Sequence, residues 1–408
     1  KNWIRITTFP GVPEYTYVSD ILPDKFNENI VYTSFNNMLQ DDFKPYILKS
    51  TDKGKTWTMI TNKLPVNGTI HSIEQDPVNQ NLLFAGSEFS FYFSVDGGNE
   101  WNEFKSGLPT SAVRDIVIQE RETDLVICTF GRGFYILDDY SPLRNFKKEI
   151  LDKDGYIFPV KEAKMFVETE GFDQQGSMYF KAANPTYGAA ITYFVKDVPK
   201  TDKSLRQEKE KELYEKGEKI PQPSYETLQA EEKEVKPYLI FTITDENNNL
   251  VKQIFKSAAK GVNRVNWNFT YSGFSPVSTT KFDPVSTGRN GIQVMPGTYK
   301  VTMSMYAKGE YKELAGPVSF NCKPLDIVTF PSTDNTAKLK WLKEASEYAR
   351  TIYGTMNYNS ELLGRANAIM QALQNTPAST QEMKKEAARL VSELEAVAFR
   401  FRGPEAKA

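Results

Sequence analysis

Residues that commonly bind metals or catalyse reactions are scarce in this 408-residue chain. It has one histidine, His71, and two cysteines, Cys128 and Cys322, with no C-x-x-C pair. Zinc sites need several closely placed Cys and His ligands, so the sequence predicts no metal site. Phosphate-binding and dinucleotide-binding glycine motifs are also missing, and we therefore expect no cofactor.

Charge imbalance and long hydrophobic segments are missing as well. The formal net charge is −2, which gives no overall field that would attract nucleic acid. No apolar run reaches the ~18 residues that a transmembrane helix requires, and no signal peptide is recognisable. Because the chain begins Lys-Asn-Trp without a methionine, we interpret it as an internal segment whose targeting signal lies upstream.

Aromatic residues, by contrast, are plentiful at 13%, with 21 Tyr and 26 Phe. Aromatic side chains fit the pleated surface of a sheet, so this content favours a mainly β fold. The face of an aromatic ring also stacks on a sugar ring, which leaves carbohydrate binding as a second interpretation.

Two octets with the pattern S-x-D-x-G-x-x-W form an internal repeat. They begin at positions 50 and 94, a period of 44 residues, and a Leu-Pro pair follows each octet at the same distance. A period of about 40–45 residues is typical of one four-stranded propeller blade. The defining residues of the octets are Ser50, Asp52, Gly54, Trp57, Ser94, Asp96, Gly98 and Trp101.

The residue types of the octet suit a tight hairpin turn. Its glycine tolerates positive φ, and its aspartate and serine accept hydrogen bonds from nearby backbone N–H groups. Its tryptophan begins the next strand and is expected to bury its indole between neighbouring sheets. A third, degenerate unit follows over residues 113–139, so residues 1–145 hold about three blades. Propellers close with about four to eight blades, so we expect further blades upstream in the parent chain or from a partner chain.

The octets resemble those of Asp-box (BNR-repeat) propellers, a family that includes sialidases, xyloglucan-cleaving hydrolases and sortilin-type receptors. The similarity is greatest to bacterial proteins of the "glycosyl hydrolase, BNR repeat" or sortilin-like type. In those proteins the last blade continues with L-P, V-R-D and T-H-G-R-x-F-x-x-L-D-D, which correspond here to 108–109, 113–115 and 129–139. The G-x-N-R-x-x-W segment at 261–267 and the P-G-T-Y segment at 296–299 match as well.

This resemblance implies the C-terminal blades of a propeller, an Ig-like module and a helical tail. It also implies an exported bacterial protein, which would be periplasmic, at the cell surface or extracellular. Phe130 departs from the family pattern, which usually has histidine there. Ser90 stands where the E-x-G-x-[YF] pattern that precedes the octet in this family has glycine. Any catalytic or ligand role of that histidine would be lost in this chain, and the fold alone implies no activity.

Beyond residue 145 we expect an Ig-like β-sandwich over residues 146–330, because many short strands alternate with turn signals. A charged stretch at 198–236 interrupts it and predicts a solvated, partly helical insertion. Helical periodicity then predicts a hairpin or small bundle over residues 331–408. Ser379 and Glu382 form a predicted capping box for its second helix. We expect the apolar stripes of these helices to form a core rather than a partner surface.

Candidate site residues gather in the last predicted blades. Glycoside hydrolysis needs two carboxylates about 5–10 Å apart, and Asp115 is the best catalytic candidate because it opens an innermost strand that can face a central channel. Glu88, Arg114 and Arg132 are candidate binding residues, since arginine pairs well with carboxylate or phosphate groups.

Structural roles compete with each of these assignments. Asp115 can have a purely structural role in its strand, and Arg132 can pair with Asp138 or Asp139 to close the last blade. A lone histidine such as His71 is more often a polar surface or core residue than a catalyst. The octet aspartates are interpreted as turn residues.

Three functional hypotheses remain open. We favour an exported binding or scaffold module for a glycan or protein ligand, because scaffold motifs are evident and a catalytic set is not. The second hypothesis is a glycoside hydrolase whose catalytic carboxylates lie mostly on the missing blades. The third is a structural subunit of a cell-envelope assembly whose missing blades come from another chain.

Overall fold

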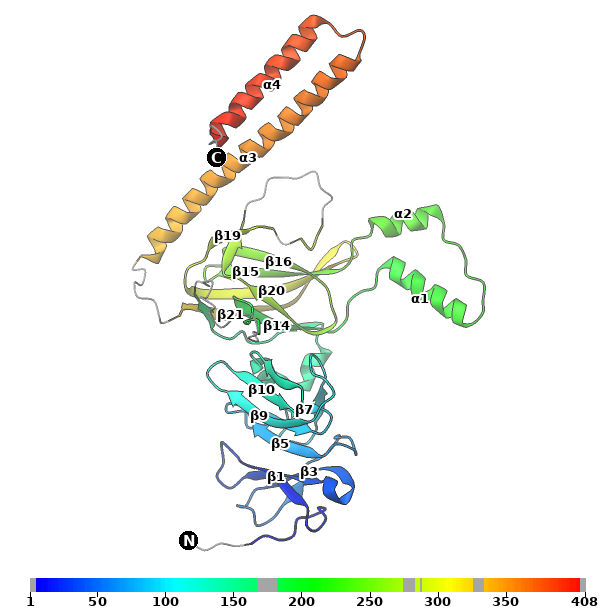
Figure 1. Cartoon of the computed structure of the whole chain (residues 1–408), viewed down its shortest axis with the longest axis vertical. Helices are drawn as coiled ribbons and strands as arrows, with labels where there is room; N and C mark the ends of the chain where they lie inside the picture. The colour runs from blue at the N-terminus through cyan, green and yellow to red at the C-terminus, as the bar shows by residue number, and fades with distance from the viewer. Residues whose placement is uncertain (1–4, 167–181, 274–282, 287, 326–333, 404–408) are drawn as a thin grey trace.

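The computed structural model describes residues 5–166, 182–273, 283–286, 288–325 and 334–403. The fold is mostly β, and a helical region follows the sheets, as the sequence predicts. Figure 1 shows the elements stacked along one long axis, with small sheets near the N-terminus, two larger sheets in the middle and two helices at the C-terminal end. The predicted boundary between residues 330 and 331 lies outside the described residues.

Three small antiparallel sheets, which we call units 1, 2 and 3, form the N-terminal part. Their strand orders are β1-β2-β3-β4, β5-β6-β7-β8 and β11-β10-β9, so each strand pairs with its neighbour in sequence. The strands are β1 (Tyr17–Pro23), β2 (Val31–Asn37), β3 (Asp42–Ser50), β4 (Thr58–Met59), β5 (Ile70–Gln75), β6 (Leu83–Ser87), β7 (Phe91–Ser94), β8 (Asn102–Phe104), β9 (Val113–Gln119), β10 (Asp124–Thr129) and β11 (Gly133–Leu137). Three 3-10 helices accompany them: η1 (Met38–Gln40), η2 (Ser141–Asn145) and η3 (Lys148–Asp152).

The two octets form the turns between β3 and β4 and between β7 and β8. In the first turn, Ser50 Oγ accepts a hydrogen bond from the N–H of Gly54 at 2.9 Å, and Asp52 Oδ1 accepts one from the N–H of Thr56 at 2.8 Å. Both bonds recur in the second octet, each at 2.9 Å. These polar side chains are therefore occupied in holding their own turns.

The two octet tryptophans have different surroundings. Trp101 is 3% exposed, and its indole N–H donates to the carbonyl of Ile60 at 2.7 Å, so the ring lies between units 1 and 2. Trp57 is half-buried, donates to the carbonyl of its own Gly54 and contacts Phe9 edge-on. The segment before β1 therefore covers the first indole, whereas a neighbouring sheet covers the second.

A second repeat, D-x-x-N-x-N, joins each unit to the chain that follows it. Asp24 precedes β2 and Asp76 precedes β6, and Oδ1 of each accepts two backbone N–H groups of its own turn. Asp24 Oδ2 accepts a bond from Gln75 of unit 2 at 2.8 Å. Asp76 Oδ2 accepts bonds from the Tyr140 hydroxyl at 2.7 Å and from Arg144 Nε at 2.8 Å, after unit 3. We call these contacts the aspartate staples.

Unit 3 has one covered face and one open face. Ile116, Leu125 and Ile127 are buried against unit 2. Residues paired directly across antiparallel strands share a face, and the pairings place the alternate side chains on the opposite face. We call this the outer face; it carries Asp115, Val117, Val126, Cys128, Phe134 and Ile136. Its Phe134 side chain is 73% exposed.

Two larger sheets pack face to face around one hydrophobic core, in which Trp267 and Phe241 are fully buried. The first has the order β12-β14-β17 and the second β13-β21-β20-β15-β16. This is the layered packing expected of a sandwich, while the Ig-like assignment remains a prediction. The strands are β12 (Gly155–Ile157), β13 (Ala163–Met165), β14 (Ala189–Val195), β15 (Tyr238–Asp245), β16 (Leu250–Ser257), β17 (Gly261–Trp267), β20 (Gly297–Ala307) and β21 (Glu310–Pro324), with β18 (Thr270–Ser272) and β19 (Asn290–Gln293) as a separate pair.

Two short helices connect β14 to β15: α1 (Asp202–Glu215) and α2 (Tyr225–Lys233). Their sequence is dominated by charged residues, and Figure 1 shows them projecting from the side of the sheets. Arg206 of α1 makes two bonds to the carboxylate of Glu231 of α2, at 2.6 and 2.8 Å. A bidentate ion pair therefore joins the two helices.

Arg264 is one of the side chains that join unit 3 to the larger sheets, and Lys161, which pairs with Glu122 of unit 3 at 3.1 Å, is another. Arg264, on β17, donates to the backbone carbonyl oxygens of Asp138 and Asp139 at 2.9 and 2.8 Å. Its Nε also contacts the hydroxyl of Thr192 on β14 at 3.1 Å. The arginine of the G-x-N-R-x-x-W segment thus has a structural partner at this joint.

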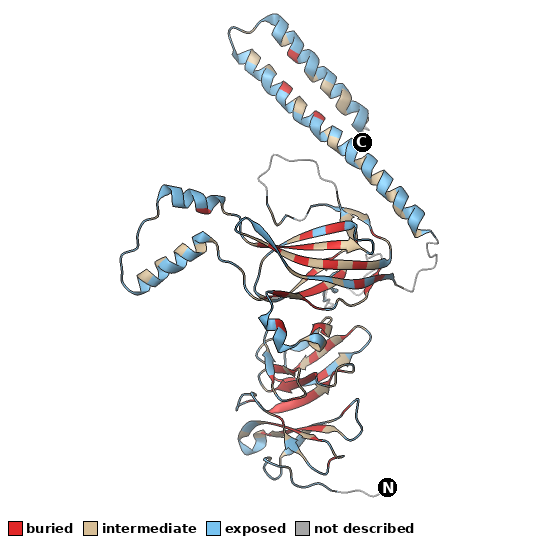
Figure 2. Cartoon of the chain, turned by 180° about the vertical axis from the view of Figure 1, so that it is seen from behind, coloured by how far each residue is buried: buried red, intermediate tan, exposed pale blue. Residues whose placement is uncertain are grey.

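The C-terminal helices are α3 (Asn335–Asn375) and α4 (Gln381–Arg402), which form an antiparallel hairpin (Figure 1). The N-cap of α4 is Thr380, which accepts the N–H of Met383, whereas Ser379 donates to a carbonyl of α3, so the predicted capping residue was wrong by one position. Within these two helices, which the structure describes in full, the buried residues are Asn359, Ala366 and Ala387. Figure 2 shows the rest as largely exposed, because two helices can bury only the seam between them.

Candidate functional site

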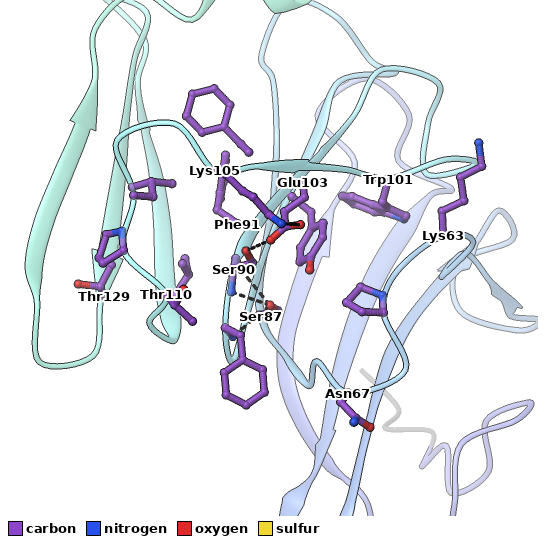
Figure 3. Close-up of a pocket in the computed structure, with 17 residues that line it drawn as sticks. Lys63, Asn67, Ser87, Ser90, Phe91, Trp101, Glu103, Lys105, Thr110 and Thr129 are labelled. Atoms are coloured by element: carbon purple, nitrogen blue, oxygen red, sulfur yellow. Dashed lines mark hydrogen bonds and ion pairs between the residues drawn. The ribbon is translucent and has the colours of Figure 1, made fainter. Parts of the chain in front are cut away.

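A cleft of about 710 Å³ lies beside the hairpin between β6 and β7, where units 2 and 3 meet (Figure 3). Its walls come from β7, β8 and the loops that flank β5 and β9. The lining residues are Lys63, Pro65, Asn67, Ser87, Phe89, Ser90, Phe91, Tyr92, Trp101, Glu103, Phe104, Lys105, Leu108, Pro109, Thr110, Val113 and Thr129. Mixed polar and aromatic walls of this size are suited to a small polar ligand.

Glu103 lies at the centre of the polar wall. It accepts a hydrogen bond from the Ser90 hydroxyl and pairs with Lys105 Nζ at 3.0 Å, as Figure 3 shows. The bond from Ser90, and secondly the one from Lys105, lower the pKa of Glu103 below its ordinary value. Ser87 holds the hairpin itself, since its hydroxyl donates to the Ser90 carbonyl at 2.9 Å. The cleft therefore presents an ionised carboxylate in a fixed position.

Some aromatic residues of the cleft are buried in its wall, whereas Phe89 is half-exposed. Tyr92 and Trp101 are 5% and 3% exposed, so they form the wall from within the core of units 1 and 2. Phe89, at the tip of the β6–β7 hairpin, is 50% exposed and contributes its ring to the lining. An exposed ring beside ordered polar groups is available to stack on a ligand.

A second cluster involves the turn of the same hairpin and joins His71, Glu88 and Arg114. His71 Nε2 lies 2.6 Å from Glu88 Oε2, and His71 Nδ1 lies 3.1 Å from an Arg114 guanidinium nitrogen. Arg114 also pairs with Glu88 at 3.7 Å, and its guanidinium covers the ring of Phe130 at 5.3 Å from the ring centroid. We call His71, Glu88 and Arg114 the histidine cluster.

The partners of His71 fix its protonation. A carboxylate can only accept and a guanidinium can only donate, so Nε2 must carry the proton and Nδ1 must be unprotonated. Burial is the largest influence on the pKa of His71 and lowers it; Arg114 lowers it further, while Glu88 opposes the shift. The neutral imidazole therefore bridges the carboxylate of Glu88 and the guanidinium of Arg114.

The structure brings together two of the four predicted site residues. Glu88 and Arg114 meet in the histidine cluster. Asp115 instead projects from the outer face, beside Cys128 and Phe134, and Arg132 is an exposed residue of the turn between β10 and β11. In the part of the chain that the structure describes, Arg132 makes no ion pair with the aspartates at 138 and 139, whose carbonyls contact Arg264.

Sequence reasoning missed most of the groups that shape this region. His71 was interpreted as an isolated polar residue, although it bridges two predicted site residues. Glu103 and Lys105, on and after β8, carried no motif at all. The available signal was their place directly after the second octet, on the strand that follows its turn.

Across the ranges described above, no three His, Cys, Asp or Glu side chains are grouped so that they could hold a metal ion. Among the same residues, no helix combines the length and the apolar character needed to span a bilayer.

The sequence matches no described protein family and no curated protein. Solved structures that show some likeness include an ancestral GH74 enzyme, at 13% identity and a TM-score of 0.24, covering 74% of this chain and 32% of that one. A GH74 xyloglucanase from Xanthomonas campestris shows 11% identity and a TM-score of 0.27, covering 76% and 56%. YCF48 bound to D1 peptide shows 11% identity and a TM-score of 0.25, covering 76% and 83%. The chain thus spans about a third to just over half of the two GH74 enzymes.

Proposed function

We propose that this chain is part of an exported binding module that uses the cleft between units 2 and 3 to hold a glycan. The observation that carries the proposal is the cleft of about 710 Å³ itself, whose lining includes both the half-exposed Phe89 and the ordered carboxylate of Glu103. A sugar offers an apolar ring face for stacking and hydroxyl groups for a fixed carboxylate. Ser90, Lys105 and Thr110 supply further polar groups along the same wall.

Binding without hydrolysis is favoured by the surroundings of the candidate carboxylates. Glu88 is paired with both His71 and Arg114, so its charge is already balanced. Asp115 lies on the outer face next to apolar side chains rather than opposite a second carboxylate. Glycoside hydrolysis requires two carboxyl groups on either side of one bond, and these positions do not offer that arrangement.

Further sheet units are proposed to cover the outer face of unit 3. Phe134 and Ile136 are 73% and 61% exposed there, and an apolar sheet face of this kind is normally packed against another layer. The covering layer would come from upstream residues of the parent chain or from a partner chain. The resemblance to exported bacterial propellers supports a location outside the cytoplasm.

A glycan array, followed by calorimetric titration of the best oligosaccharide, tests the proposal on the intact protein. We expect Phe89→Ala to weaken binding by about tenfold, because one stacking contact is lost. Tyr214→Ala is the matched control, since Tyr214 of α1 is 76% exposed and does not line the cleft, and it should leave the affinity unchanged. A folded protein that binds no glycan on the array would contradict the assignment and favour a protein ligand.

Release of reducing sugar from the same glycans distinguishes the hydrolase hypothesis. The binding proposal predicts no release by the intact parent protein, with or without Asp115→Asn or Glu88→Gln. Release that falls by orders of magnitude in either variant would identify a catalytic carboxylate and replace the binding proposal.

A further inference from the structure

The hairpin of α3 and α4 carries an apolar groove along one side. The groove has a volume of about 950 Å³. Its apolar lining consists of Leu362, Ala366, Ile369, Leu373, Met383, Ala387, Leu390, Leu394 and Val397. Ile369 and Met383 are 55% and 54% exposed, so the lining is presented to solvent rather than buried within the chain.

The spacing of this lining is that of a helical bundle. On α3 the apolar residues fall at 362, 366, 369 and 373, and on α4 they fall at 383, 387, 390, 394 and 397. Steps of three and four residues place them in a single stripe on each helix, as in the core positions of a heptad. Two such stripes side by side form half of a four-helix core.

Charges along the groove are distributed by helix. Arg365 lies on the α3 edge, whereas Glu382, Glu386 and Glu393 lie on the α4 edge. Arg365 pairs within α3, and two of the glutamates pair with Arg389 within α4, but all these partners are at least 43% exposed. Exposed ion pairs of this kind contribute little to stability, so they do not prevent new contacts at the rim.

A second copy of the same hairpin matches this pattern. If two hairpins face each other across a twofold axis, α3 of one copy lies on α4 of the other. The basic edge of each α3 then meets the acidic edge of the partner α4, and the two apolar stripes close over each other. A partner of uniform charge would satisfy one edge of the groove and oppose the other.

Figure 1 shows that the hairpin extends away from the sheets, which leaves the groove accessible. The contact of α3 with the sheets includes Lys343, whose ammonium lies 4.9 Å from the ring centroid of Tyr271, near the start of the helix. The groove begins at Leu362, about 29 Å further along α3 at a rise of 1.5 Å per residue. Another hairpin can therefore approach without meeting the sheets.

We propose that this groove is a homodimer interface, in which the α3–α4 hairpins of two chains form an antiparallel four-helix bundle. This inference is independent of the glycan cleft. It predicts that the full chain, with a mass of 46.4 kDa, associates reversibly to twice that mass.

Sedimentation equilibrium of the full chain over a range of micromolar concentrations tests the proposal. Leu390→Glu places a charge inside the closed groove and should weaken dimerisation at least about a hundredfold. Phe399→Glu is the matched control, because Phe399 is 59% exposed on the same helix and does not line the groove. The control should dimerise as the unmodified chain does, and circular dichroism should show equal helix content in all three proteins.

Charge reversal distinguishes the twofold dimer from nonspecific hydrophobic association. Arg365→Glu alone should weaken the dimer about tenfold, and combining it with Glu386→Arg and Glu393→Arg should restore dimerisation. A chain that stays monomeric throughout, or a dimer that persists in Leu390→Glu, would overturn the proposal. So would a groove that binds lipid vesicles or a foreign helix while the chain remains monomeric.

Discussion

The sheet units and the helical hairpin differ in how far their side chains find partners within the chain. Asp76 is fully buried and holds four partners in the staple that joins unit 2 to the segment after unit 3. Ile369 and Leu390, in the middle of the hairpin, are 55% and 42% exposed. The difference shows that the buried polar groups between sheet units find their partners within the chain, whereas the apolar stripes of the two helices, like the outer face of unit 3, stay partly exposed.

Geometry explains this difference. A sheet has two faces, and each inner face in units 1 to 3 meets the next unit, which gives continuous cores around residues such as Leu83 and Leu125. A helix hairpin has a single seam, and its other apolar positions need a further layer. Polar staples and an apolar groove are therefore consequences of the same requirement at two ends of the molecule.

Asp76→Ala tests whether the aspartate staples stabilise the sheet units. This change leaves Arg144 partly buried without its anion and removes the acceptor of Tyr140, so we expect a loss of about 3–5 kcal/mol in the free energy of unfolding. Urea denaturation followed by tryptophan fluorescence measures it. Asp115→Ala, at an exposed position, should change the stability by about 0.5 kcal/mol or less. Equal losses in the two variants would show that the staple adds nothing to the free energy of unfolding beyond an exposed aspartate.

A smaller effect is expected from filling space in the second octet. Gly98 has a φ of 92°, and an added Cβ would lie 2.6 Å from Cδ1 of Ile60, so Gly98→Ala should cost about 2–4 kcal/mol. Gly131 has a φ of 74° with no atom near its Cβ position, so Gly131→Ala should cost about 1–2 kcal/mol. Thermal denaturation of the two variants compares packing with backbone strain. A cost at Gly131 as large as that at Gly98 would contradict the close approach between units 1 and 2.

The hairpin should respond less to loss of the polar contact that Asn359 makes across its seam. Asn359 Nδ2 donates to the carbonyl of Leu394 at 3.1 Å across the seam. We expect Asn359→Ala to cost about 1 kcal/mol, measured by denaturation at the helical circular dichroism band. Asn367→Ala, at an exposed position of the same helix, is the control and should have little effect. A loss near that of Asp76→Ala would mean that the hairpin is as closed as the sheets.

The smallest expected effect is a pH dependence from His71. Its pKa is lowered by burial in the folded state, so the unfolded chain binds the proton more readily. Stability from the neutral ring is present above the unfolded pKa of about 6.5 and is lost as the pH falls below it toward the folded pKa. The difference in unfolding free energy between pH 7 and pH 5 should shrink in His71→Gln. An unchanged pH profile in that variant would mean that the histidine cluster does not control the titration.

The mainly β fold and the helical C-terminal region could be predicted because their signals are local. Each octet bond spans at most four residues, so the turn around Asp52 is legible in sequence alone. The turns of the D-x-x-N-x-N repeat at Asp24 and Asp76 are equally local. The role of these aspartates in joining the units was missed, because their outer partners lie 51 to 68 residues away. The propeller closure, the Ig-like assignment and the domain boundaries stay predictions.

The candidate site was harder to predict because it depends on strand register. His71 meets Glu88 and Arg114 across 17 and 43 residues, contacts that no spacing rule reveals. Alternation along β9 then separates neighbours: Arg114 points toward unit 2 with Ile116, while Asp115 points to the outer face. The helical stripes were predicted to be a core, yet Leu390 stays exposed, since periodicity shows which face is apolar and not what covers it.

The joint formed by Arg264 has an evolutionary consequence. Its guanidinium donates hydrogen bonds to the backbone oxygens of positions 138 and 139 rather than to their carboxylates. Main-chain carbonyls are present whatever side chain occurs, so mutations at these two positions can accumulate without loosening the connection between unit 3 and the larger sheets. The arginine has no such freedom, because a lysine cannot reproduce its two parallel bonds. Across relatives, we expect variation on one side of this joint and constancy on the other.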